Sequence, residues 1–133
     1  FGGEHSGHFY FRDFWKADSG MLAALHAMAA LGETSAGTAL SDLLKKYSRY
    51  VESGEINSRV ENAPLVVANI KAQYDNQAGV TLDELDGLTV SGADWWFNVR
   101  ASNTEPLLRL NAEAKTPARV KEIVDAVLKV IRG

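Results

Sequence analysis

Apolar positions in the first third of the chain recur at helical spacing, after a short aromatic strand. The run 9–11, Phe-Tyr-Phe, has strand character. A helix is predicted from Asp18-Ser19, which offers a cap, to Gly32, a natural stop, and a second helix from near Thr38. The apolar stripes of these helices are expected at Met21, Leu22, Leu25 and Met28, and at Leu40, Leu43, Leu44 and Tyr47.

The pattern changes near Ser48, after which strand signals dominate. Helices are predicted from Pro64 to Gly79 and from a Thr116 cap onward. The buried face of the last helix is expected at Val120, Ile123, Val124, Val127 and Ile131. Strands are predicted at 50–60, 80–82, 87–91, 95–101 and 107–114. The resulting order, β-α-β-β-β-β-α, predicts an α+β fold with helices layered on an antiparallel sheet.

Composition and charge narrow the classes of function. Hydrophobic residues make up 46% of the 133, which supports a packed core and argues against global disorder. The net charge is −3 and no basic run exceeds Lys45-Lys46, so nucleic-acid binding is disfavoured. The longest apolar stretch, around 21–31, is too short for a membrane span. Cysteine is absent, which excludes disulfide chemistry and fits a cytoplasmic location. Because the chain opens at Phe1 without Met, we expect a piece of a longer protein.

The loop 100–106 gathers groups that bind anions. Arg100 can form a bidentate fork on a phosphate, and Ser102, Asn103 and Thr104 supply hydroxyl and amide donors. Arg109 could add a second cation from the following strand. A tight hairpin whose polar side chains satisfy their own backbone explains the same composition equally well.

A second polar loop, 3–8, lies near the start of the chain. Glu4 could accept hydrogen bonds from sugar hydroxyls, Ser6 could add another contact, and His8 titrates near neutral pH and could transfer a proton. The alternatives are an unstructured end and a metal site built from Glu4, His5 and His8. A metal is disfavoured because no other ligand-rich cluster completes the set.

Two further groups have structural interpretations. We interpret Trp95-Trp96 as one ring in the core and one covering a sheet face, rather than as a sugar-stacking platform. The acidic residues Asp83, Glu84 and Asp86 are interpreted as a solvated turn rather than an acid/base site.

Both polar loops resemble motifs of one family, the α-D-phosphohexomutases. The string 100–109, Arg-Ala-Ser-Asn-Thr-Glu-Pro-Leu-Leu-Arg, resembles the phosphate-binding loop of that family's last domain. The string 3–8 resembles its Gly-Glu-x-Ser-Gly-His motif, in which His5 takes the variable position. The resemblance implies that Glu4 and Ser6 bind the sugar. It implies that the phosphate is held by Arg100, Ser102, Asn103 and Thr104, with Arg109 in support.

The resemblance also implies an organisation and a chemistry. Residues 1–48 would end the third, α/β domain, and residues 49–133 would form the complete fourth domain, with a TATA-box-binding-protein-like topology. The family converts hexose 1-phosphate to hexose 6-phosphate through a phosphoserine and a bisphosphate, with magnesium. The serine motif, Thr-Ala-Ser-His-Asn-Pro, and the magnesium motif, Asp-Gly-Asp-Gly-Asp, do not occur in these 133 residues. We therefore expect no cofactor in this chain and no mutase activity from it alone.

Two alternatives to this assignment stay open. The first is a fragment of a phosphoglucosamine mutase. Asn103 favours the phosphomannomutase/phosphoglucomutase type instead, because phosphoglucosamine mutases tend to have Gly at this position of the loop. The chain could instead be a stand-alone phosphosugar-binding module. The expected partners are a hexose phosphate, of mannose or glucose, and the remainder of the same polypeptide.

Overall fold

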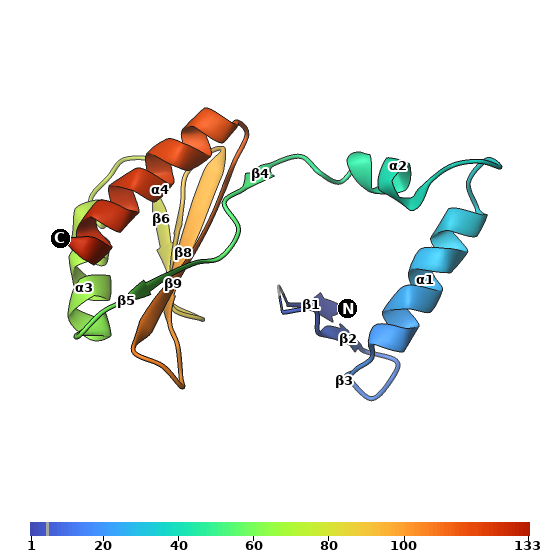
Figure 1. Cartoon of the computed structure of the whole chain (residues 1–133), viewed down its shortest axis with the longest axis horizontal. Helices are drawn as coiled ribbons and strands as arrows, with labels where there is room; N and C mark the ends of the chain where they lie inside the picture. The colour runs from blue at the N-terminus through green and yellow to red at the C-terminus, as the bar shows by residue number, and fades with distance from the viewer. Residues whose placement is uncertain (5) are drawn as a thin grey trace. The chain divides into compact units, whose positions relative to one another are not determined.

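The computed structural model describes residues 1–4 and 6–133, which form two compact units, Phe1–Ser48 and Arg49–Gly133 (Figure 1). We call these unit 1 and unit 2. Each unit has its own antiparallel sheet, and together with the helices this confirms the predicted α+β class.

Unit 1 consists of short strands followed by helices. The strands β1 (Gly2–Gly3), β2 (Phe9–Phe11) and β3 (Ala17–Asp18) pair in that order, all antiparallel. Helix α1 (Gly20–Gly32) begins where predicted, because the Ser19 side chain accepts a hydrogen bond from the Leu22 N–H at 3.2 Å. Helix α2 (Leu40–Lys45) follows.

The apolar stripes of unit 1 are largely exposed, with only Leu22 and Leu43 half-buried. Neither α1 nor α2 has a buried residue, and Met21 and Met28 are 74% and 61% exposed. The expected helices therefore exist, but within the described part of unit 1 their apolar positions are at most half-buried. The hydrophobic core of the chain lies in unit 2.

Unit 2 has the predicted element order. Its strands are β4 (Val51–Glu52), β5 (Ile56–Arg59), β6 (Thr81–Asp83), β7 (Leu88–Ser91), β8 (Trp95–Ala101) and β9 (Leu107–Ala114). The strands pair as β4-β9-β8-β7-β6, and β5 pairs with β9 beyond β4. The helices are α3 (Ala63–Tyr74) and α4 (Pro117–Arg132), and both lie over the same face of the sheet (Figure 1).

Two boundaries differ from the predictions. The strand predicted at 50–60 is broken into β4 and β5, because Ser53 turns to β9 and Gly54 adopts a φ of +66°. The Ser53 N–H donates to the Ala112 oxygen, and the Ser53 hydroxyl accepts from the Ala112 N–H, both at 2.9 Å. Helix α3 ends at Tyr74, before Gly79, which instead supplies a left-handed turn into β6.

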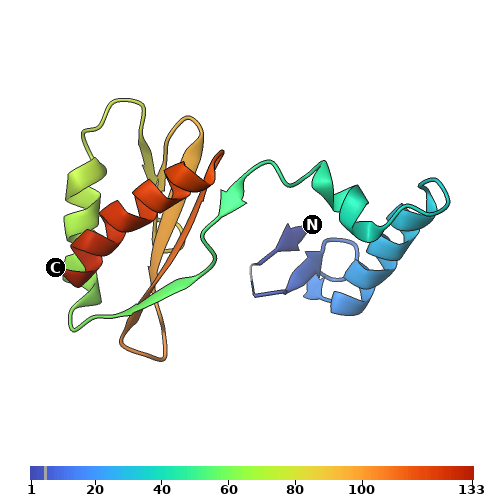
Figure 2. The same ribbon diagram turned by 45° about the horizontal axis from the view of Figure 1, so that its top comes forward.

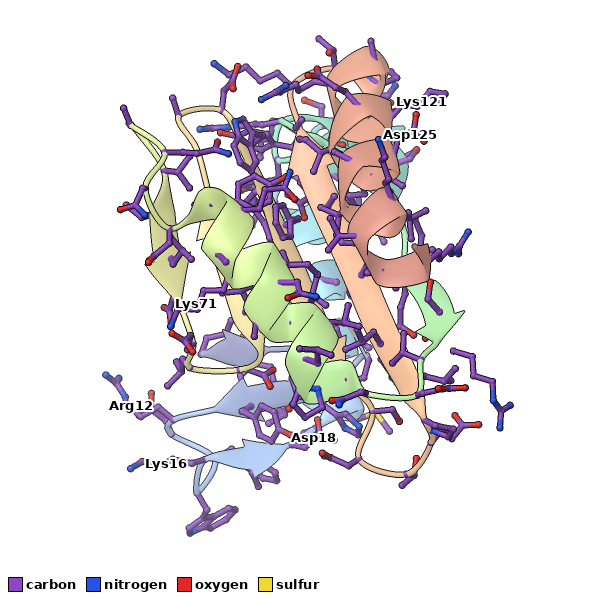
Figure 3. All side chains as sticks on the ribbon, turned by 90° about the vertical axis from the view of Figure 1, so that its left-hand side faces the viewer. Arg12, Lys16, Asp18, Lys71, Lys121 and Asp125 are labelled. Carbon is purple, nitrogen blue, oxygen red and sulfur yellow. The ribbon has the colours of Figure 1, made fainter. Side chains whose placement is uncertain are left out.

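The core of unit 2 follows from strand alternation. Phe97 and Val99 on β8 and Leu108 and Leu110 on β9 are fully buried under the helices. Figure 3 looks onto this layer, with α3 and α4 in front of the strands. The helices bury Ile70, Tyr74, Val120, Ile123, Val127 and Ile131. Val124, expected on this face, is only partly buried. Alternate positions of β8 and β9 therefore turn polar side chains to the opposite sheet face.

In the described part of the chain, no helix combines the length and apolar character that crossing a membrane requires.

Candidate functional site

The loop 100–106 connects β8 to β9 at one end of the unit 2 sheet (Figure 2). Its backbone is fixed locally, since the Ser102 N–H donates to the Leu107 oxygen at 2.9 Å. The Thr104 N–H reaches the Ser102 hydroxyl at 3.4 Å, and the two hydroxyl oxygens lie 3.5 Å apart. Asn103 and Thr104 are exposed and Ser102 is half-buried. Part of the hairpin interpretation is therefore correct, yet the loop still presents donors to solvent.

Arg100 and Arg109 lie directly opposite each other on β8 and β9, on the sheet face away from the helices. Two like charges in such a cross-strand pair repel. Each arginine is compensated by a carboxylate. The Arg100 Nη1 donates to the Asp86 Oδ2 at 2.8 Å, and the Arg109 Nη1 lies 3.6 Å from the Glu55 Oε2. The structure thus brings both predicted cations together beside the loop.

Arg109 has a nitrogen that its surroundings leave unsatisfied. Its Nε is buried and has no hydrogen-bond partner among the described residues. A buried donor without a partner costs about 1–3 kcal/mol. Despite this cost, Arg109 is held in place by its pairing with Glu55. Its position on β9, between β8 and β5, also holds it, and Asn57 of β5 is its register partner.

In unit 1, the loop after β1 is a closed turn that organises Glu4 and Ser6. The Glu4 N–H donates to the His8 oxygen at 2.9 Å, and Gly7 supports the turn with a φ of +84°. The Ser6 hydroxyl donates to the Glu4 Oε2 at 3.1 Å, and the Tyr10 hydroxyl donates to the Glu4 Oε1 at 2.8 Å. The latter hydrogen bond is the main reason that the pKa of Tyr10 is raised.

Tyr10 was missed by the sequence analysis as a site residue. Its signal is its place in β2, where it pairs in register with Gly2 and so lies beside the turn that carries Glu4. Ser6 and Tyr10 thus donate to different oxygens of the Glu4 carboxylate, which orients both oxygens.

His8 is paired with Asp18, on β3. The His8 Nδ1 lies 2.7 Å from the Asp18 Oδ2, and the Phe9 N–H donates to the Asp18 Oδ1, also at 2.7 Å. The hydrogen bond to Asp18 raises the pKa of His8, and the same bond lowers the pKa of Asp18. Figure 3 labels Asp18 on its strand.

Asp18 was interpreted from sequence as part of a helix cap, but Ser19 alone caps α1. Ten residues separate Asp18 from His8, so only the pairing of β2 with β3 brings them together.

A metal site is not supported by the described residues. His5, one member of the alternative metal set, lies outside them. Within residues 1–4 and 6–133, no group of three or more His, Asp or Glu side chains could hold an ion.

The tryptophans have the expected structural roles. Trp95 stacks on Phe97 with ring centres 6.1 Å apart and packs against the core. Trp96 points to the other sheet face, where its Nε1 donates to Glu113 at 3.2 Å.

Both units match models of known protein domains. Residues 55–130 match the family model for the C-terminal domain of phosphoglucomutase/phosphomannomutase, and residues 1–50 match the model for its alpha/beta/alpha domain III. A phosphomannomutase of Methanocaldococcus jannaschii is 40% identical over 131 residues, which are 98% of this chain and 28% of that protein. A phosphomannomutase of Salmonella montevideo is 42% identical over 130 residues, 93% of this chain and 28% of that protein.

A solved structure extends the similarity to the fold. The crystal structure of a phosphoglucomutase/phosphomannomutase family protein from Burkholderia thailandensis superimposes with a TM-score of 0.75 and 26% identity. That alignment covers 98% of this chain and 27% of the other. The chain thus spans less than a third of the length of these relatives. The chain belongs to the phosphoglucomutase/phosphomannomutase family, whose third and C-terminal domains it matches.

Proposed function

We propose that this chain is the phosphosugar-binding part of a phosphohexomutase that interconverts hexose 1-phosphate and hexose 6-phosphate. The observation that carries the proposal is the placement of Arg100 beside Arg109, next to the exposed donors of the loop 102–104. Two guanidinium groups on one sheet face match the double negative charge of a phosphate monoester. The names of the relatives, all mutases of phosphorylated hexoses, support the same substrate class.

In this proposal the loop in unit 2 anchors the phosphate that is not reacting. Arg100 binds its oxygens through a guanidinium edge, and Ser102, Asn103 and Thr104 donate hydrogen bonds to it. Arg109 supplies additional positive charge from β9. Fixing the idle phosphate turns binding energy into orientation of the reacting end of the sugar.

The loop in unit 1 contacts the sugar. Glu4 accepts hydrogen bonds from ring hydroxyls, with Tyr10 and Ser6 holding its two oxygens in place. His8 transfers a proton at a reacting hydroxyl, and Asp18 fixes the orientation of its ring and favours its protonated form.

The phosphoryl transfer itself belongs to other residues of the parent protein. There, a phosphoserine would supply the phosphoryl group and magnesium would assist its transfer to the sugar, by way of a hexose bisphosphate. Neither the serine motif nor the acidic magnesium motif occurs in these 133 residues. We therefore expect the chain alone to bind the substrate without converting it.

A nitrogen-15 NMR titration tests this proposal. We expect mannose 1-phosphate and glucose 1-phosphate to shift the amides of Ser102, Asn103 and Thr104, with a Kd on the order of 1 mM, about −4 kcal/mol. The same ligands are expected to shift the amides near Glu4 and Ser6, whereas inorganic phosphate should leave that loop unchanged. Shifts that appear only in unit 1, or that are scattered over α4, would contradict the assigned roles.

A further inference from the structure

The acidic turn before β7 does more than face the solvent. Its three carboxylates have three different partners. The Asp83 Oδ1 accepts from the Leu85 N–H at 2.7 Å, and Glu84 forms an ion pair with Lys71 of α3. Only Asp86 reaches the candidate phosphate site, where it accepts from Arg100.

Asp86 is itself held by a second contact. The Asn98 side-chain amide, two residues before Arg100 on β8, donates to the Asp86 backbone oxygen at 2.8 Å and to the Thr89 hydroxyl at 2.9 Å. The same strand therefore provides both the arginine and the amide that fixes the partner of the arginine. An aspartate whose backbone is held in this way orients its partner better than one on a free loop.

Gly87 allows the acidic turn to lie close against β8. It adopts a φ of +72°, and a Cβ at this position would lie 2.5 Å from the Val99 carbonyl oxygen and 3.0 Å from the Arg100 Cα. Both are backbone atoms, so no side-chain movement could relieve the contact. The turn thus needs glycine to lay the main chain after Asp86 directly against the strand that carries Arg100.

From these contacts we infer that Asp86 is a positioning residue for Arg100, which rests on the proposed phosphate-binding function of this loop. Asp86 accepts a hydrogen bond from the Arg100 Nη1, so the Nε and Nη2 edge of the guanidinium stays available for a phosphate. An arginine side chain loses much rotational freedom when it binds. Holding it in place beforehand removes part of that loss.

A simpler role for Asp86 makes the opposite prediction. An exposed ion pair contributes little by itself, and the Arg100 and Asp86 side chains are 46% and 71% exposed. If Asp86 only neutralised Arg100, its removal would strengthen the attraction for an anion. If Asp86 orients Arg100, its removal weakens binding in spite of the lost negative charge. The sign of the change therefore separates positioning from neutralisation.

The experiment compares Asp86→Asn with Glu84→Gln in the 133-residue chain, with inorganic phosphate as the NMR probe. Both variants remove one negative charge from the same turn, but Glu84 contacts Lys71 and not Arg100. We expect Asp86→Asn to weaken phosphate binding by about threefold. We expect Glu84→Gln to tighten binding by less than about twofold, because salt screens the distant charge.

A second readout reports on the arginine itself. The Nε–H of Arg100 should show a lower NMR order parameter in Asp86→Asn than in the unchanged chain without phosphate. Asp86→Glu, which keeps the carboxylate on a longer side chain, should recover part of both the affinity and the order. Asn98→Ala should move both quantities in the direction of Asp86→Asn, by a smaller amount.

The outcomes separate the inference from the function on which it rests. If Arg100→Ala abolishes phosphate binding while Asp86→Asn leaves it equal or tighter, Asp86 does not position Arg100 and the inference is overturned. If the unchanged chain shows no phosphate-dependent shift at the loop, the proposed function fails and the inference fails with it. Weaker binding in Asp86→Asn together with a more mobile Arg100 supports both.

Discussion

Unit 1 and unit 2 each carry a polar candidate loop, but different kinds of structure hold the two loops in place. In unit 2, the loop 100–106 connects two strands whose inward side chains are fully buried. In unit 1, the turn that carries Glu4 and Ser6 follows a two-residue strand, and none of the described side chains of that unit is buried. Hydrogen bonds and one His–Asp pair provide much of the local order in unit 1, whereas hydrophobic packing provides it in unit 2.

A polar site can therefore be arranged by local contacts without a hydrophobic core beneath it. The contacts of Glu4 and His8 span ten residues or fewer along the chain, so the strands β1 to β3 suffice to form them. The arginine pair of unit 2 depends on the registration of β8 against β9, which the buried core fixes. Substitutions should therefore act on unit 1 mainly through lost polar contacts and on unit 2 mainly through lost hydrophobic packing.

The largest contrast is expected from core truncation. Phe97→Ala removes a fully buried ring that contacts Tyr74 and Trp95, and should lower the free energy of unfolding of unit 2 by about 3–5 kcal/mol. Phe14→Ala, at a ring that is 36% exposed, should cost unit 2 less than about 0.5 kcal/mol. Urea unfolding followed through the amide signals of each unit measures both. Equal losses in the two variants would show that unit 1 shares the core.

Helix caps give a smaller contrast with matched geometry. The Thr116 hydroxyl accepts from the Arg119 N–H at 3.2 Å, and the Ser19 hydroxyl accepts from the Leu22 N–H at the same distance. Thr116→Ala should lower the unfolding free energy of unit 2 by about 1 kcal/mol, because α4 packs on the core. Ser19→Ala should only increase amide exchange in the first turn of α1, which has no buried residue. A global loss from Ser19→Ala would contradict this.

The His8–Asp18 pair makes unit 1 sensitive to pH. Asp18 raises the pKa of His8 above its usual value of about 6.5. The stabilisation from His8 is therefore complete below the pKa it has in the unfolded chain, and is lost as pH rises through its raised value in the folded chain. The lowered pKa of Asp18 means that its own contribution is lost only as pH falls through that lowered value. NMR titration of the His8 ring should show the raised pKa, and Asp18→Asn should lower it.

The smallest effect is expected at the surface of α4. Lys121 and Asp125 form an exposed i,i+4 ion pair, with side chains 75% and 59% exposed (Figure 3). Breaking this pair with Lys121→Ala should change the unfolding free energy of unit 2 by less than about 0.5 kcal/mol. Thermal unfolding in low and high salt measures the change, and a loss comparable to that of Thr116→Ala would be inconsistent with a solvated pair.

Much of unit 2 could be predicted from its sequence, because the alternation in 95–101 and 107–114 coincides with strands that are buried on one side. The Thr116-Pro117 start of α4 was equally clear, since the cap and the first-turn proline are local signals. The break between β4 and β5 was not predicted, because Ser53 forms its hydrogen bonds with a residue far along the chain.

The same limit applies to the candidate sites. The loop motifs predicted Glu4, Ser6, Arg100 and the residues 102–104 as site residues, and each motif is continuous in sequence. Asp18 was interpreted as a helix cap and Asp86 as part of a solvated turn. Their pairing with His8 and Arg100 was not predicted, because only strand pairing or a turn against a neighbouring strand brings them near. The repeating pattern predicted the apolar stripe of α1 but not its exposure, since such a pattern predicts a helix without saying what covers it.

The most direct test of the phosphate site compares the Kd for inorganic phosphate of the unchanged chain with that of Arg100→Ala. Lys121→Ala serves as the control, because it removes one positive charge from the helix layer, away from the loop. We expect Arg100→Ala to abolish the shifts of Ser102, Asn103 and Thr104 at several millimolar phosphate, and Lys121→Ala to leave them unchanged. Equal binding by Arg100→Ala and the unchanged chain would contradict the assignment of this loop as the phosphate site.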